Sequence, residues 1–103
     1  MASRVEALKT LVAANPKDVF AHYALAMALA GAGQPEEAVT EFETVLSLDP
    51  NYSVAYFQMG QALEKLGRLQ EARQIYERGV EVTKRLGQAH AREQLESALE
   101  LLG

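Results

Sequence analysis

The chain has 103 residues, no cysteine and a formal net charge of −4. This length accommodates a single domain, and 49% hydrophobic residues with 23% charged residues are typical of a folded chain rather than a disordered one. The absence of cysteine excludes disulfide scaffolds, thiol nucleophiles and cysteine-ligated zinc. The acidic balance argues against a dedicated nucleic-acid binder, so we expect no nucleic acid among the partners.

Targeting signals and membrane spans are not expected in this sequence. Residues Met1 to Arg4 lead directly into a polar segment, so we expect no signal peptide. Every apolar run is shorter than the roughly 18 residues that cross a bilayer, so we expect no membrane partner. Together with the missing cysteines, which suit a reducing compartment, these features favour a cytoplasmic location.

The first predicted element is a helix over residues 3–14. It begins with a capping box, in which the Ser3 hydroxyl accepts from a backbone amide one turn on and the Glu6 side chain reaches back. An apolar stripe at helical spacing follows, formed by Val5, Leu8, Leu11 and Val12.

Two helices joined by a short turn are predicted next. Gly33 suits the end of the first, because glycine adopts the left-handed backbone conformation without a Cβ clash, and Pro35 suits the first turn of the second. Pro50 then ends the second helix. Their apolar faces are formed by Ala21, Leu25, Ala28 and Leu29 and by Ala38, Phe42, Val45 and Leu46.

The same pattern recurs 34 residues further along the chain. Gly67 matches Gly33, and Phe57 matches Tyr23. Further matched pairs are Ala21 and Ala55, Leu29 and Leu63, Ala38 and Ala72, and Phe42 and Tyr76. We therefore predict one domain over residues 1–103, with a leading helix at 3–14, two helix–turn–helix units at 19–52 and 53–86, and a last amphipathic helix at 88–102. The predicted fold class is all-α, with about six helices and no strand.

A helix–turn–helix period of 34 residues with small residues at these positions resembles the tetratricopeptide repeat (TPR) family. The first unit carries the pattern at Leu25-Ala26, Leu29, Gly33, Ala38, Phe42 and Pro50, and the second at Met59-Gly60, Leu63, Gly67, Ala72 and Tyr76. Three residues depart from the usual pattern, namely His22, Ala26 and Lys84, of which Lys84 replaces a proline. The helix before Gly87 is therefore expected to end differently. The resemblance implies a right-handed superhelix of antiparallel hairpins, capped by the last helix.

No catalytic or metal-binding constellation is apparent in the sequence. His22 and His90 lie two periods apart, so we expect both to be packing residues rather than a metal or acid–base pair. Gly31-Ala32-Gly33 follows a helix instead of a strand, which favours a loop over a phosphate cradle. We therefore predict no enzyme activity, no cofactor and no metal site.

Charged residues are expected to lie mainly on solvated helix faces. Pairs four residues apart are predicted within helices, namely Glu64 with Arg68, Arg73 with Glu77 and Glu81 with Arg85. Four acidic residues, Glu36, Glu37, Glu41 and Glu43, are expected on a convex face, and a docking patch for a basic partner is the alternative.

The family resemblance also implies which side chains would line a concave groove, since in TPR proteins the first helix of each unit does so. The candidate peptide-binding residues are Phe20, Tyr23, Met27, Phe57, Gln58 and Gln61, and the last helix would add Gln88, Ala91, Arg92 and Leu95. The Lys and Asn that clamp a peptide carboxylate in some members are absent, since Tyr23 and Met27 stand at those positions.

These features predict a protein-interaction module that scaffolds another protein by binding its apolar helix or extended peptide in the groove. The alternative is a homo-oligomer, in which another copy fills the groove or an end face.

Overall fold

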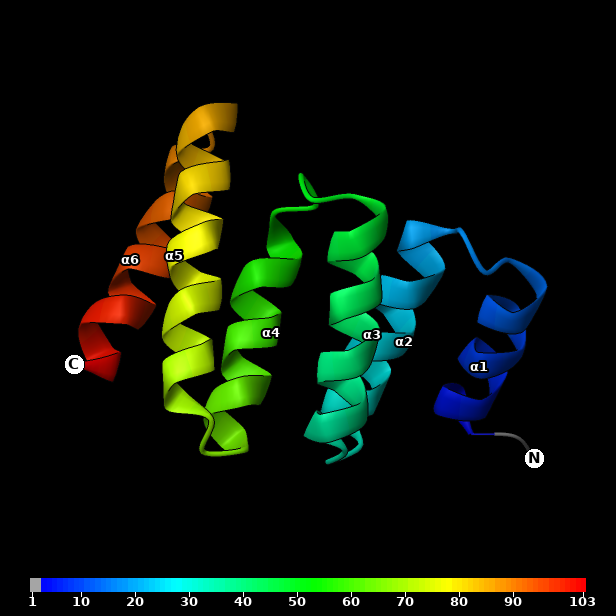
Figure 1. The fold of residues 1–103 in the computed structure, drawn as a ribbon. Helices are drawn as coiled ribbons and strands as arrows, with labels where there is room; N and C mark the ends of the chain where they lie inside the picture. The colour runs from blue at the N-terminus through cyan, green and yellow to red at the C-terminus, as the bar shows by residue number, and fades with distance from the viewer. Residues whose placement is uncertain (1–2) are drawn as a thin grey trace.

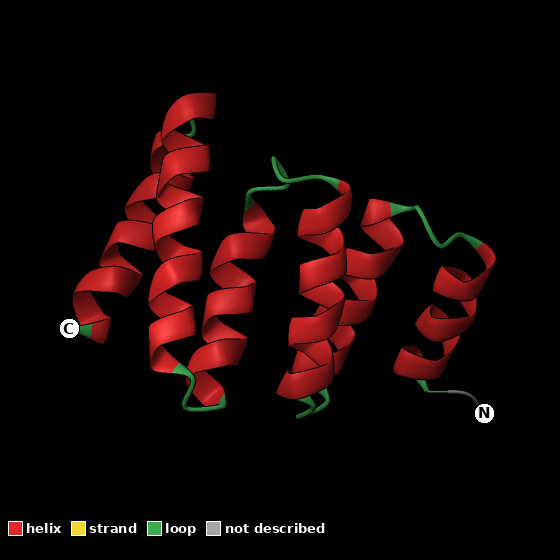
Figure 2. Cartoon of the chain, in the orientation of Figure 1, coloured by secondary structure: helices red, strands yellow, loops and turns green. Residues whose placement is uncertain are grey.

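Six helices and no strand make up residues 3–103, the part of the chain that this computed structural model describes. The helices are α1 (Arg4–Ala14), α2 (Val19–Gly31), α3 (Pro35–Leu48), α4 (Val54–Lys65), α5 (Leu69–Leu86) and α6 (Ala89–Leu102). They are joined by short loops only (Figure 2). The predicted all-α fold class is confirmed. Residues 1–2 lie outside the described residues. The segment in which we expect no signal peptide begins there.

Side-chain caps start the first two helices. The Glu6 amide donates to the Ser3 hydroxyl at 3.1 Å, as the capping box predicts. Ser3 is the N-cap, and α1 begins at the next residue, Arg4. The Ala21 amide likewise donates to the Asp18 carboxylate at 3.2 Å. Each cap satisfies a backbone donor that the first turn of a helix leaves without a partner.

Glycines reverse the chain between the two helices of each unit. Gly33 has φ 76° and Gly67 has φ 73°, both left-handed as predicted. The next amide donates back across the turn at 2.9 Å in each case, from Gln34 to the Leu29 carbonyl and from Arg68 to the Leu63 carbonyl. These Schellman motifs satisfy the last carbonyls of α2 and α4 and turn the chain into antiparallel hairpins.

Helix α5 ends differently from its counterpart α3, as the missing proline predicts, and it is also the longer of the two. Helix α3 ends at Leu48, just before Pro50, whereas α5 continues through Lys84 to Leu86. Gly87 then ends α5 with φ 72° and lets α6 fold back along it. The extra turn projects beyond the neighbouring helices in Figure 1.

Each helix packs against the next one along the chain, so that the stack grows in sequence order from α1 to α6 (Figure 1). Helix α2 also contacts α4, and α4 also contacts α6. The alternate helices therefore form a continuous surface, which we call the α2–α4–α6 face.

Small residues permit this packing at the positions the sequence indicates. Ala26, Ala38 and Ala72 are fully buried. Gly60 lies directly under the Tyr76 ring, and a Cβ added there would approach ring atoms more closely than real Cβ atoms do. A single apolar core runs through α2 to α6, and no helix within residues 3–103 is both long and apolar enough to cross a membrane.

Candidate functional site

Two aromatic rings on the α2–α4–α6 face lean on the core in the same way. The centroid of the Tyr23 ring lies 6.0 Å from that of Phe42, and the Phe57 ring lies 6.3 Å from Tyr76. These pairs are related by the 34-residue period. Tyr23 also packs on Tyr52 at 5.2 Å, and burial, followed by the charge of Tyr52, raises the pKa of Tyr23. Both rings are half-buried, so one side of each supports the fold and the other is available to a ligand.

Tyr23 and Phe57 meet at a crevice of about 110 Å³ between α2, α4 and α6, which we call the central crevice. Gln58 lines it as well, so three of the six predicted site residues are brought together. The full lining is Tyr23, Ser53, Val54, Phe57, Gln58, Ala91, Gln94 and Leu95. Ser53 donates to the Gln88 side chain at 2.5 Å, which ties the start of α4 to the start of α6 beside the crevice.

A second, wider depression of about 520 Å³ lies between α4 and α6, and we call it the α4–α6 hollow. Phe57 borders both depressions and thereby joins them. The lining of the hollow is Phe57, Gln61, His90, Glu93, Gln94, Ser97, Ala98 and Leu101. Leu101 is 90% exposed at its edge. The two depressions together offer apolar and amide surface along one side of the molecule.

Gln61 connects the α4–α6 hollow to a buried polar network. Its amide donates to the Tyr76 hydroxyl at 2.6 Å and to the Glu64 carboxylate at 3.3 Å. The Tyr76 hydroxyl in turn donates to Glu64. Burial of the ring, followed by the Glu64 hydrogen bond, raises the pKa of Tyr76 far above its ordinary value. The network holds Gln61 in place on the lining of the hollow, with Glu64 behind it.

The remaining two predicted site residues lie apart from the central crevice. Phe20 is 68% exposed and lines neither depression, although Val54, its equivalent one period later, lines the crevice. Met27 faces the N-terminal turn of α1, where it lines a depression with Arg4 and Val5. The structure thus places Tyr23, Phe57, Gln58 and Gln61 around two adjoining depressions, with Phe20 and Met27 outside them.

Helix α6 contributes more residues than the sequence indicated. Ala91 and Leu95 line the central crevice as expected, whereas Arg92 pairs with Glu96 at 3.7 Å. The residues missed from α6 are His90, Glu93, Gln94, Ser97, Ala98 and Leu101. Their spacing of three and four residues places them on one helix face, and that periodicity could have identified them.

His22 is a buried packing residue, as predicted, and it is also hydrogen-bonded at both ring nitrogens. Nδ1 lies 2.7 Å from the Glu41 carboxylate, and Nε2 lies 2.7 Å from the Pro16 carbonyl. Both partners are acceptors, so the doubly protonated ring satisfies both. Burial alone would lower the pKa of His22, but the Glu41 and Pro16 hydrogen bonds, with the charges of Glu41 and Asp18, raise it.

The prediction that His90 is a packing residue is wrong, since its side chain is exposed. Tyr56 occupies the equivalent position one period earlier, and its hydroxyl donates to the Pro50 carbonyl at 2.7 Å, just as His22 bonds Pro16. For His90, the residue equivalent to Pro16 and Pro50 is Lys84, which lies inside α5 rather than in a loop. No loop carbonyl is therefore present there to hold the ring.

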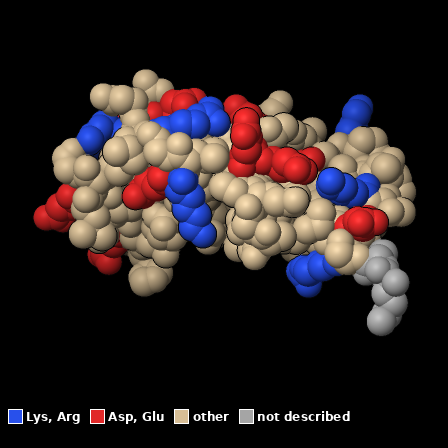
Figure 3. Space-filling model, turned by 90° about the horizontal axis from the view of Figure 1, so that it is seen from below, with Lys and Arg blue, Asp and Glu red and all other residues tan. Residues whose placement is uncertain are grey.

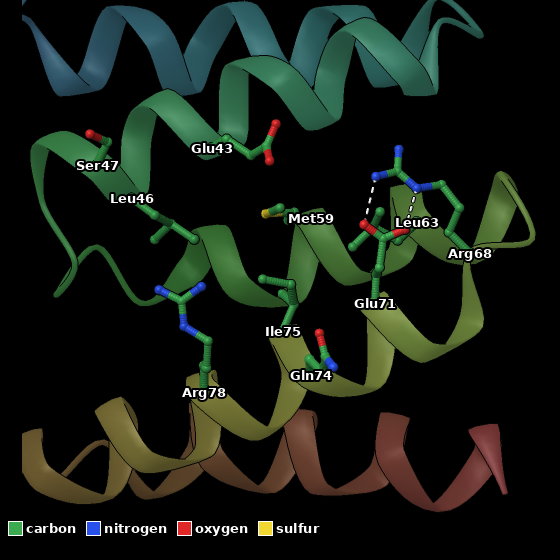
Figure 4. A pocket seen from close by; sticks show the side chains of 10 residues that line it. All are labelled: Glu43, Leu46, Ser47, Met59, Leu63, Arg68, Glu71, Gln74, Ile75 and Arg78. Atoms are coloured by element: carbon green, nitrogen blue, oxygen red, sulfur yellow. Dashed lines mark hydrogen bonds and ion pairs between the residues drawn. The ribbon is translucent and has the colours of Figure 1, made fainter.

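A cleft of about 360 Å³ lies on another side of the molecule, between α3 and α5, and α4 forms its base (Figure 4). Its floor is apolar, formed by Leu46, Met59, Leu63 and Ile75, with Ser47 and Gln74 beside it. Its charged residues are Glu43, Glu71, Arg68 and Arg78. Arg68 donates to both carboxylate oxygens of Glu71, at 2.5 and 2.7 Å. Two charges of each sign leave this cleft without a preference for a charged ligand.

The predicted ion pairs four residues apart are not the ones that form. Arg68 pairs with Glu71 rather than Glu64, and Arg85 donates to the Asn51 side chain at 2.7 Å. In the acidic set on α3, Glu37 pairs with Lys9 at 3.5 Å and Glu41 binds His22. Figure 3 shows acidic and basic side chains interspersed across the face seen from below, with uncharged areas between them.

Comparison with known proteins identifies the family. A model described as tetratricopeptide repeat matches residues 29–92, and a second with the same description matches residues 7–40. The chain belongs to the tetratricopeptide repeat family, whose repeats form a protein-interaction fold. The predicted resemblance and the TPR-like superhelical fold are therefore confirmed.

Individual relatives agree with this assignment. Small glutamine-rich tetratricopeptide repeat-containing protein 2 of Mycosarcoma maydis is 32% identical over 99 residues, which cover 91% of this chain but only 28% of that protein. A tetratricopeptide repeat domain protein from Salinibacter ruber, solved in solution, is 30% identical with a TM-score of 0.79, over 85% of this chain and 89% of that one. The TPR2B domain of yeast Sti1, in a complex with pHsp70, has a TM-score of 0.88 at 17% identity, over 95% of this chain and 78% of that one.

Proposed function

We propose that this chain binds an apolar helix or an extended peptide of another protein on its α2–α4–α6 face. The observation that carries the proposal is the central crevice, where Tyr23 and Phe57 from adjacent units border one depression. Such rings bury a large area with few rotatable bonds, which suits them to be anchors. Membership of a protein-interaction family supports the role, and so does the complex with pHsp70 in which the Sti1 domain was solved.

The chemistry of α2 favours an apolar partner segment over one that ends in a carboxylate. Helix α2 contains no Lys or Arg, and its sequence from Val19 to Gly31 is almost entirely apolar. Tyr23 and Met27 occupy the positions at which some family members hold a peptide carboxylate. A free carboxylate placed beside these side chains would lose water without gaining a cation.

Capture of partners from the source cell by the purified chain, followed by mass spectrometry, tests the proposal. The Tyr23→Ala, Phe57→Ala double variant should lose the partners that the wild type captures. Leu69→Ala is the matched control, because Leu69 is 50% exposed on α5 and lines neither depression. The control should capture the same partners as the wild type.

Each ring of the double variant also supports the core, so its helicity must be measured by circular dichroism. The second variant, Phe20→Ala with Leu101→Ala, removes side chains that are 68% and 90% exposed and therefore leaves the fold intact. It should weaken capture, because Leu101 lines the α4–α6 hollow and Phe20 is the equivalent, one period earlier, of Val54 in the central crevice. Retention of the same partners by both folded variants would contradict the proposal.

Self-association is the second candidate function, and the exposure of Phe20 and Leu101 favours it specifically. Large apolar side chains that face solvent are frequent at interfaces between identical chains. Sedimentation at several protein concentrations separates the two candidates. A monomer throughout supports the proposed binder, whereas a dimer that Leu101→Ala dissociates supports self-association.

A further inference from the structure

Among the residues that the structure describes, the α4–α6 hollow is lined by one carboxylate and by no Lys or Arg. Glu93 lies on its wall, and the basic side chain among its lining residues is His90, which forms no ion pair with Glu93. The ion pairs within residues 3–103 do not include Glu93, so this carboxylate faces the depression without a cation from those residues. The cation nearest to Glu93 in sequence is Arg92, which pairs with Glu96 and lines neither depression.

A second carboxylate lies behind the first layer of the hollow. Glu64 is half-buried and accepts hydrogen bonds from Gln61 and Tyr76, both of which are neutral donors. Within residues 3–103, no Lys, Arg or His forms an ion pair with it. Since Gln61 lines the hollow and donates to Glu64 at 3.3 Å, the negative charge of Glu64 lies one side chain behind that lining.

The first unit has no such charge at the equivalent positions. One period earlier, Met27 stands in place of Gln61 and Ala30 in place of Glu64. The sequence of α2 contains no acidic residue at all. The α2–α4–α6 face therefore changes along its length, from an apolar surface on α2 to a depression between α4 and α6 with the Glu93 carboxylate on its wall and Glu64 behind its lining.

We infer that the α4–α6 hollow binds a cationic amphipathic segment of another protein, an inference that rests on the proposed function. The apolar side chains of the segment would pack on Phe57, Ala98 and Leu101, and its Lys or Arg side chains would reach Glu93. The charge of Glu64 behind Gln61 would add to the attraction without direct contact. Complementary charge selects the partner and its orientation more than it adds affinity. An acidic segment would instead bring like charges together inside the hollow.

Three synthetic amphipathic peptides test this inference. They share one apolar face and carry Lys, Gln or Glu at the flanking positions, and their binding to the full chain is measured by fluorescence anisotropy. We expect the Lys peptide to bind most tightly and the Glu peptide most weakly, with the difference shrinking as salt is added. Glu93→Gln should weaken the Lys peptide about two- to fivefold, the range for a partly exposed ion pair.

A matched variant separates local recognition from the net charge of the molecule. Glu81→Gln makes the same charge change at an exposed position on α5 that lines neither depression, and it should change the affinity for the Lys peptide much less. Equal effects of the two variants would overturn the inference, because the preference would then be a property of the whole chain.

The outcomes also distinguish this inference from the proposed function. If all three peptides bind equally and Phe57→Ala abolishes binding, the charge preference is refuted while the proposed function stands. If none of the peptides binds, the inference fails, and the capture experiment decides the proposed function separately. If the chain sediments as a dimer that Leu101→Ala dissociates, a second copy occupies the hollow and the inference is overturned.

Discussion

The contact between Gly60 and Tyr76 gives a prediction that opposes simple helix propensity. Gly60 lies inside α4, where alanine is favoured over glycine by about 1 kcal/mol. A Cβ at this position, however, would overlap Cε1, Cζ and Cδ1 of the fully buried Tyr76 ring. The ring cannot withdraw freely, because its hydroxyl is held by Glu64 and Gln61. We expect Gly60→Ala to destabilise the fold.

The magnitude follows from three contributions. Overpacking of a filled core costs about 1–3 kcal/mol. A displaced ring also loses its hydrogen bond to the Glu64 carboxylate, worth about 1.5–3 kcal/mol. The improved helix propensity offsets about 1 kcal/mol of this sum. The net loss is about 2 kcal/mol or more, which lowers the melting temperature of a domain of this size by about 8–16 °C.

Denaturant unfolding followed by circular dichroism measures this loss, and a double-mutant cycle tests its cause. The first unit carries Ala26 and Phe42 at the equivalent positions, so the period itself pairs alanine with a ring that lacks a hydroxyl. Tyr76→Phe frees the ring from Glu64 and Gln61, and the double variant should therefore lose less stability than the two single variants together. A Gly60→Ala variant as stable as the wild type would refute this account.

Three other perturbations have definite expected outcomes. The stabilisation that protonated His22 provides should be fully present below about pH 6.5 and lost as pH rises through the raised pKa of His22 in the folded state. Denaturant unfolding of the wild type and of His22→Tyr across this pH range should show this loss of stability in the wild type alone. Truncation after Gly87 removes the buried Leu95 and Ala98, so it should lower the free energy of unfolding by several kcal/mol or cause aggregation. An unchanged melting temperature and solubility would be evidence against a capping role for α6. Added zinc should leave the melting temperature unchanged, because no three potential ligands cluster within residues 3–103, and a saturable upward shift at stoichiometric zinc would disprove this.

The fold was predictable because its determinants are local and periodic. Gly33, Pro35 and Pro50 each act through their own backbone, so their positions set the ends of helices without knowledge of any neighbour. The different end of α5 followed from the same reasoning, since Lys84 stands where the first unit has Pro50. The 34-residue match then indicated how successive hairpins stack.

The details of the candidate site were less predictable because they depend on contacts between helices. The period correctly paired Tyr23 with Phe57, but it could not show that Met27 faces α1 or that α6 presents His90 to solvent. Charged residues were the least predictable. Glu64 has a partner for an ion pair one turn away in Arg68, yet the Tyr76 hydroxyl from α5 binds it instead. Such choices among long side chains are made by the tertiary structure rather than by spacing along one helix.

The equivalence of the turns at Gly33 and Gly67 has a consequence for how this chain can be lengthened. Their φ angles differ by only a few degrees, and the amide that closes each turn donates at the same 2.9 Å. A gene in which residues 34–67 are duplicated in tandem would therefore encode an in-frame extra hairpin. Its second end is the native Gly67–Arg68 turn, and its first end joins Gly67 to Gln34 through the geometry that both native turns share. The inserted copy of α4 would meet the original α5 across its native surface. Each such duplication would extend the α2–α4–α6 face by about 10 Å, the usual spacing of packed helices, and with it the length of the segment that the face can accommodate.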